Sequence, residues 1–142
     1  MAKDWRRHAR EAALQILYQW EIGKVDPHQA IETYFSWQWP RTAPPSDDLV
    51  TFASTLVRET VARLEAIDPL IAATAQRWRP ERMAILDRLI LRMAVCELMR
   101  DTNLPPPVAI NEALELARTF STDDAVKFIN GMLDAIRKKI ER

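Results

Sequence analysis

The sequence predicts an all-α fold of about seven helices in two packed helical bundles. Only two glycines, Gly23 and Gly131, occur in 142 residues. Long stretches are rich in Ala, Leu, Arg and Glu, which favour helix. The nine prolines cluster between stretches whose apolar residues repeat with helical spacing. We therefore expect helices joined by short loops, with no strand and no repeat.

The first helix is expected from about Trp5 to Ile22, because Gly23 is a residue that commonly ends helices. At roughly 100° per residue, its apolar residues share one broad face. The members of this face are Trp5, Ala9, Ala12, Ala13, Ile16, Leu17 and Trp20. Three arginines fall on an adjacent arc and should form one exposed basic edge: Arg6, Arg7 and Arg10.

Local signals divide the next part of the chain. A second helix should begin near Pro27, and the three prolines of segment 39–45 exclude helix there. Ser46 with the two aspartates that follow it predicts the cap of a third helix. Asp68-Pro69 predicts the start of a short fourth helix, since proline suits the first helical position. The bundles are accordingly expected over about 1–67 and 68–142.

Three further helices are expected in the C-terminal bundle. Pro80 should open a fifth helix to about Met99, which is apolar almost all round and so is predicted to be the buried central helix. A sixth helix follows the proline-rich loop of 101–107, and segment 121–124 predicts the cap of a seventh. Gly131 inside that helix costs roughly 1 kcal/mol relative to Ala and should mark close helix packing.

Charge and composition exclude several classes of protein. The formal net charge is zero, but the charge is unevenly distributed. Segment 26–68 holds three basic and seven acidic residues, whereas segment 3–11 holds four basic and two acidic residues, so the surface should be electrostatically two-sided. The lone Cys96 predicts a buried thiol and no intrachain disulfide. No apolar run approaches the roughly 18 residues of a membrane span, and the charged N-terminus lacks a signal-peptide core. A cytoplasmic protein is expected.

The sequence contains no recognisable catalytic or metal-binding motif. It has no Gly-rich phosphate loop, no CxxC and no HExxH. Its two histidines, His8 and His28, fall in different helices, which excludes a local metal site. We expect no enzyme activity, no metal and no cofactor.

Two segments could bind nucleic acid. The basic edge of the first helix, with His8, can meet phosphates and bases, although from the residues alone a solvated helix face with Arg–Glu pairs is favoured, since short basic runs are common. Lys127, Phe128 and Asn130 follow a capped helix start that favours anions, although Phe128 could be core and Asn130 a buried amide. For Glu97, near an apolar face, a structural ion pair is favoured over a partner contact.

Four stretches resemble the NusB family, in the family's order. They are segment 6–18 (RRHAREAALQILY), segment 87–98 in the central helix, segment 107–113 (PVAINEA) and segment 127–134 (KFINGMLD). Together they extend the resemblance over nearly the whole chain. The family fold is an all-α pair of bundles, which agrees with the helix count above.

The resemblance implies a bacterial transcription antitermination factor. Family members bind single-stranded boxA-type RNA with NusE, a small-subunit ribosomal protein, and this complex joins elongating RNA polymerase, notably on ribosomal RNA operons. By resemblance, the RNA phosphates are held by Arg6, Arg7 and Arg10. The RNA path is lined by Asp124, Lys127 and Phe128, and His8 stands where many relatives have another basic residue. Tyr18 and Asp87 match positions of the NusE contact.

Alternatives remain at this point. A NusB-like domain also targets some ribosomal RNA cytosine methyltransferases to their RNA, and a helical scaffold without an RNA role would carry the same apolar patterns. Monomer and homodimer are both compatible with the sequence. Segment 37–45, with two tryptophans and three prolines, matches no recognised part of the family.

Overall fold

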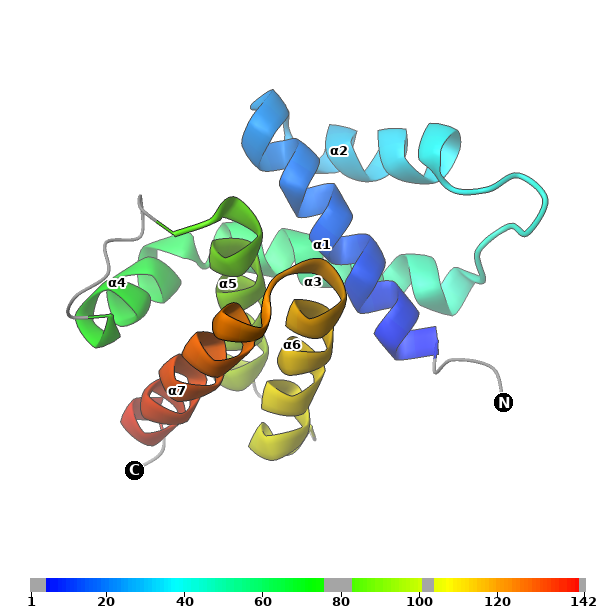
Figure 1. The fold of residues 1–142 in the computed structure, drawn as a ribbon. Helices are drawn as coiled ribbons and strands as arrows, with labels where there is room; N and C mark the ends of the chain where they lie inside the picture. Colours follow the sequence, from blue (N-terminus) through cyan, green and yellow to red (C-terminus); the bar gives the residue numbers. More distant parts are fainter. Residues whose placement is uncertain (1–4, 76–82, 101–103, 141–142) are drawn as a thin grey trace. The chain divides into compact units, whose positions relative to one another are not determined.

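A computed structural model of the protein describes residues 5–75, 83–100 and 104–140 (Figure 1). Within these ranges it contains seven α-helices and one π-helical turn, and no strand. This confirms the all-α class and the expected helix count. The chain divides into two compact units between Val61 and Ala62, six residues before the boundary expected from the sequence. Each unit is described by itself below.

The N-terminal unit begins with α1 (Trp5–Gly23). This helix ends where the sequence predicts, but Gly23 is its last residue and not the left-handed one. Lys24 takes that conformation, with φ 52°, and its N–H donates to the carbonyl oxygen of Trp20 at 3.0 Å. The turn therefore uses a residue with a side chain where glycine is more common.

A short helix and a π-helical turn follow. Asp26 caps α2 (Pro27–Thr33) by accepting the His28 N–H at 2.7 Å. The chain continues directly into η1 (Tyr34–Gln38), which the sequence does not indicate. The Trp39 N–H closes this turn on the carbonyl oxygen of Tyr34 at 2.9 Å, a span of five residues.

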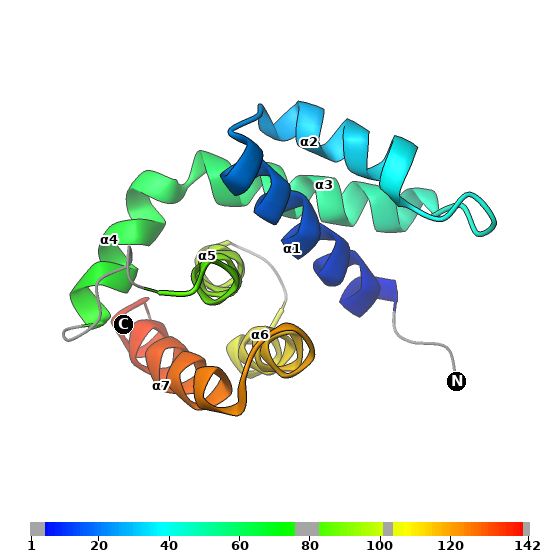
Figure 2. The same cartoon turned by 45° about the horizontal axis from the view of Figure 1, so that its top comes forward.

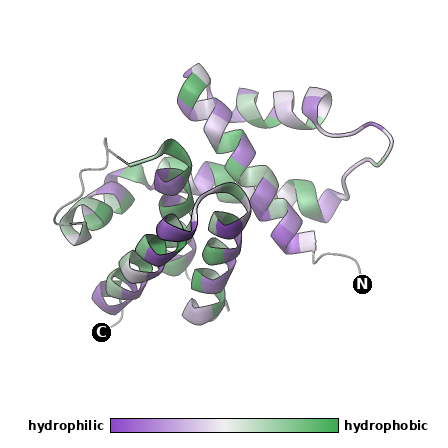
Figure 3. Ribbon diagram, viewed as in Figure 1, coloured by the Kyte–Doolittle hydropathy of each residue, from purple (hydrophilic) through white to green (hydrophobic). Residues whose placement is uncertain are grey.

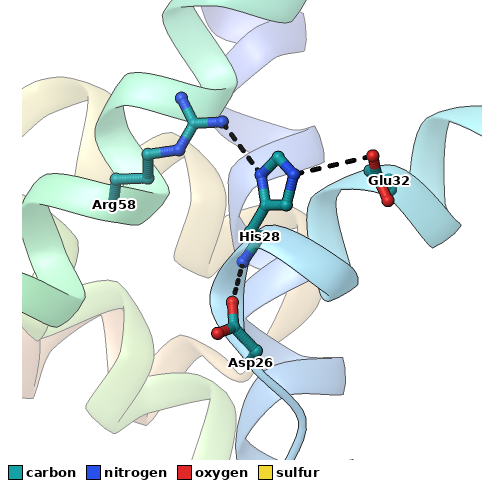
Figure 4. Close-up of polar contacts among 4 residues, drawn as sticks. All are labelled: Asp26, His28, Glu32 and Arg58. Carbon is teal, nitrogen blue, oxygen red and sulfur yellow. Dashed lines mark hydrogen bonds and ion pairs between the residues drawn. The ribbon is translucent and has the colours of Figure 1, made fainter.

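The helix α3 (Asp47–Ala62) begins as predicted, since the Ser46 hydroxyl accepts the Leu49 N–H at 3.1 Å. It contacts α2 through exposed polar groups (Figure 4). The His28 ring lies between Arg58 of α3 and Glu32 of α2, with Nδ1 3.4 Å from Arg58 Nη2 and Nε2 3.5 Å from Glu32 Oε1. No cluster of three metal-ligating side chains occurs in the described parts of the chain.

The core of the N-terminal unit is mainly apolar, with Arg10, Ser54 and Thr60 as its buried polar residues and one buried tyrosine. Its buried side chains include Leu14, Ile16, Leu17, Ala30, Ile31, Leu49, Leu56 and Val57. The buried Tyr34 donates its hydroxyl hydrogen to Gln15 Oε1 at 3.0 Å. Burial raises the pKa of the Tyr34 phenol above its ordinary value of 10.0, and the Glu11 carboxylate raises it further.

The raised pKa of Tyr34 predicts a loss of stability at alkaline pH. The neutral phenol contributes stability that is fully present below pH 10, where the unfolded chain also holds the proton, and is lost as pH rises through the folded-state pKa. Urea unfolding measured at intervals above pH 9 should show a shallower decline for Tyr34→Phe than for the wild type. Tyr18→Phe, at the exposed tyrosine, is the matched control. Equal slopes for the wild type and Tyr34→Phe would refute the prediction.

The C-terminal unit corrects the expected fourth helix. The helix α4 (Leu64–Thr74) begins four residues before Asp68, so Asp68-Pro69 lies inside it and does not open it. Asp68 instead forms a two-pronged ion pair with Arg92 of α5, with Nε–Oδ1 and Nη2–Oδ2 both 2.9 Å. We attribute the difference to this pair and to the burial of Ile67 and Ile71, which offset the one backbone hydrogen bond that Pro69 removes.

The helix α5 (Ile85–Met99) is the centre of this unit. It packs against α4, α6 and α7, and Figure 2 views it nearly end-on among them. Its buried residues run from Leu89 to Ala94 with only Arg92 half-buried among them, and then to Glu97, which confirms the expected central helix. Pro80 lies outside the described residues; residues 83 and 84 are not helical. Cys96 is buried, as expected, and so is Glu97.

The last two helices form a contacting pair, α6 (Pro106–Phe120) and α7 (Asp123–Ile140). The Thr122 hydroxyl accepts the Ala125 N–H at 3.1 Å, so the predicted cap of the seventh helix is confirmed. Apolar residues alternate with polar ones along both helices at helical spacing (Figure 3). No described helix is long and apolar enough to cross a membrane.

Gly131 does not mark close helix packing, which corrects the expectation from the sequence. It lies on the exposed face of α7, and apart from the backbone of its own helix a Cβ added there would meet nothing within 4 Å. Asn130 is exposed as well, so the interpretation as a buried amide is wrong. Helical periodicity places 131 on the same face as 124 and 127, and this face is open to solvent.

Because the position is open, Gly131→Ala is expected to raise the free energy of unfolding by about 1 kcal/mol, the difference in helix propensity between the two residues. Urea denaturation would measure it. Ala135→Gly, in the same helix, is the reverse control and should lower stability by at least the same amount. A destabilised Gly131→Ala protein would mean that a neighbour occupies the space.

Candidate nucleic-acid interface

The exposed basic edge lies in the first two turns of α1. Arg6 is exposed, and its guanidinium carbon lies 4.7 Å from the centroid of the Trp5 ring. Trp5 is held in turn by an edge-to-face contact with Phe52, with ring centroids 5.8 Å apart. The tryptophan ring therefore supports the guanidinium from one side. Arg7 is half-buried and His8 is exposed, so the edge offers two cations and an imidazole.

Arg10 does not belong to the exposed edge, although the sequence groups it there. Only 5% of the residue is exposed, and its guanidinium carbon lies 5.1 Å from the centroid of the Phe52 ring. Position 10 falls between the basic arc and the apolar face, and Phe52 of α3 draws the guanidinium inward as a planar stacking partner. The arginine thus contributes to the packing of α1 on α3.

An aromatic cluster extends the edge and was not predicted. The His8 ring lies 5.3 Å from that of Trp39, tilted by 48°. Phe35 and Tyr34 also contact Trp39, with ring centroids 5.8 and 6.2 Å away. The two tryptophans of segment 37–45 were the visible signal, but the sequence does not show that the π-helical turn carries Trp39 to His8.

The predicted residues of α7 lie in the C-terminal unit, at the start of that helix. Asp124 and Lys127 are exposed, and Phe128 is half-buried. Asp124 and Phe128 line a pocket of about 410 Å³ whose other walls come from the start of α5 and the α6–α7 turn. Phe128 is thus partly accessible, and a planar ring near a helix N-terminus suits a base and its phosphate.

The pocket brings together residues that the sequence assigns to different ligands. Asp87, expected at the protein partner, lines the same pocket as Asp124 and Phe128. Its Oδ1 accepts the Ser121 hydroxyl hydrogen at 2.6 Å, which fixes the carboxylate against the turn before α7. Asp87 is therefore a positioning group for that turn as well as a pocket wall.

Tyr18 lies in the other unit, on α1, and is 40% exposed. It lines a shallow pocket of about 310 Å³ between α1 and α2, with Ile22, Val25 and Ala30 among the other walls. Ile22 is 52% exposed. Exposed apolar side chains around a tyrosine are typical of a surface that contacts protein.

The family of this chain follows from its match to a family model. Residues 7–138 match the model of the NusB family. The chain belongs to the NusB family. The matched range includes the basic edge from Arg7 onward, the whole pocket at Asp87 and the closing segment of α7.

Similar proteins include relatives named as antitermination proteins and solved structures. The chain is 45% identical over 135 residues to the "Transcription antitermination protein NusB" of Solibacter usitatus, covering 95% of this chain and 90% of that protein. The structure of T. maritima NusB superposes with a TM-score of 0.84 at 31% identity, covering 98% and 94% of the two chains. A structure of "Antitermination Factors NusB and NusE in complex with dsRNA" superposes with a TM-score of 0.83 at 26% identity, covering 95% of this chain and 97% of that chain.

Proposed function

We propose that this NusB-family chain is a cytoplasmic transcription antitermination factor that binds boxA-type RNA together with NusE and acts within the RNA polymerase elongation complex. It works by binding and not by catalysis. The observation that carries the proposal is the exposed Arg6 and His8 end of α1 in a chain that matches antitermination proteins over nearly its full length. The similar proteins reported above are NusB proteins, and none is named as a methyltransferase.

The proposed RNA site has two parts, one in each unit. Arg6 and Arg7 neutralise phosphates, and His8 stacks beside them; Arg10 supports the edge from beneath through Phe52. At the start of α7, Lys127 meets phosphate and Phe128 stacks on a base, with Asp124 beside them. NusE binds at Tyr18 and Asp87, and each ligand raises the affinity for the other. The chain acts as one RNA-binding domain.

Fluorescence anisotropy of a labelled boxA RNA tests this function. The protein is titrated with and without NusE at two salt concentrations, and a scrambled RNA of equal length is the control. We expect binding that prefers boxA, strengthens with NusE and weakens with salt, because the protein has zero net charge and binds through a local basic edge. Equal binding of both RNAs in the presence of NusE would refute the function.

A further inference from the structure

The end of η1 and the turn that follows it expose a large aromatic surface. Trp37 is 74% exposed, more than the other exposed large apolar residues of the described chain. The guanidinium carbon of Arg41 lies 5.6 Å from the centroid of its ring. One guanidinium can cover only one face of the ring, so the other face is open to solvent. An exposed tryptophan of this kind marks an interaction surface.

The same turn is fixed in place and joined to the basic edge of α1. Trp39 is half-buried, and its Nε1 donates to the carbonyl oxygen of Ala43 at 2.7 Å, which closes segment 39–43 into a turn. The Trp39 ring also contacts His8 of α1. Trp39 thus links His8 of α1 to the segment that carries Trp37, at the end of η1, and Arg41, in the turn after it; all of these residues lie in the N-terminal unit.

The charge of this turn suits nucleic acid. Segment 33–46 holds Arg41 and no acidic residue, although the surrounding part of the chain is rich in acids. Arg41 over Trp37 repeats the pairing of Arg6 over Trp5 on α1. Planar rings interleaved with guanidinium groups are the combination that holds single-stranded nucleic acid, since rings stack on bases and guanidinium groups meet phosphates.

We propose that Trp37 and Arg41 form a base-stacking platform for single-stranded RNA that lengthens the RNA site beyond α1, with Trp39 joining the two. Trp37 stacks on an unpaired base, and Arg41 meets the adjoining phosphate. The bound strand then includes nucleotides outside those held by Arg6, Arg7 and His8. This inference rests on the proposed function and adds a second group of nucleotides to it.

An RNA length series with matched variants tests the platform. A labelled boxA RNA is compared with the same RNA extended by four nucleotides at its 5′ end, or at its 3′ end, by fluorescence anisotropy in the presence of NusE. We expect one extension to tighten binding about tenfold, the scale of stacking one base on an aromatic ring. Trp37→Ala should abolish that gain without changing the affinity for the short RNA, whereas Trp37→Phe should keep most of it.

Two controls separate the platform from a structural role. Val108→Ala removes another exposed apolar side chain, from α6, and should bind both RNAs as the wild type does. Thermal unfolding of Trp37→Ala should match the wild type, because its ring is mostly in solvent. An extended RNA that binds wild type and Trp37→Ala equally would overturn the platform and leave the proposed function intact. Failure of the wild type to bind the short RNA would overturn the function itself.

Discussion

Replacing Arg6 and Arg7 together with Ala should weaken boxA RNA binding about 10- to 100-fold. In the proposed site each guanidinium contributes a charge-assisted hydrogen bond to phosphate, and because the edge is partly exposed the expected loss is smaller than two buried bonds of this kind would give. The slope of log affinity against log salt should also become shallower by about 1.4, since two phosphate contacts to a single strand are lost. Anisotropy titrations over a salt series measure both.

The double variant Arg137→Ala/Lys138→Ala is the matched control, because it removes the same charge from the last turn of α7. Its boxA affinity should stay within about twofold of the wild type, and its salt slope should be unchanged. Should both double variants lose affinity equally, binding would depend on overall charge and the basic edge of α1 would have no special role.

Arg10→Ala, by contrast, should act mainly on stability. The substitution removes a side chain that is almost fully buried and leaves the Phe52 ring without its guanidinium. Loss of the cation–π contact and of the packed alkyl stem should lower the free energy of unfolding by about 2–3 kcal/mol. Arg10→Lys keeps the charge without the planar group, so its free energy of unfolding should lie between those of the wild type and Arg10→Ala. Urea denaturation measures the series.

Arg6→Ala provides the comparison, since its exposed guanidinium should leave the urea midpoint almost unchanged. The two substitutions should therefore have different effects: Arg6→Ala should lower RNA affinity, and Arg10→Ala should lower stability. An Arg10→Ala protein that unfolds at the wild-type urea concentration but loses RNA affinity would instead return Arg10 to the phosphate-binding role that the sequence assigns it.

Helix boundaries followed the sequence wherever a local group decides them. Ser46 and Thr122 cap their helices because a short hydroxyl reaches an N–H three residues ahead, whatever the rest of the protein does. Asp68-Pro69 carries an equally good local signal, yet it lies inside α4. There the partner is Arg92, 24 residues away, and no local pattern identifies it.

In the candidate site, too, the sequence predicts local groupings but not contacts between helices. The sequence placed Arg6, Arg7 and His8 together, because they are consecutive residues in the first turn of one helix. It did not separate Arg10 from them, because its burial depends on Phe52 of another helix. Nor did it join Trp39 to His8, since the π-helical turn between 34 and 38 has no clear sequence signature.

The sequence by itself determined the helical class, most helix starts, the buried central helix and the family, because these depend on spacing and on groups a few residues apart. Tertiary structure alone decided which polar side chains are drawn inward and which face outward. Arg10 belongs by position to an exposed basic edge but is buried. Asp68 has the local pattern of a helix cap but forms an ion pair with Arg92, and Gly131 suggests close packing but faces open space. The physical reason is that burial, ion pairing and empty space are properties of packed neighbours, which lie far away in the chain.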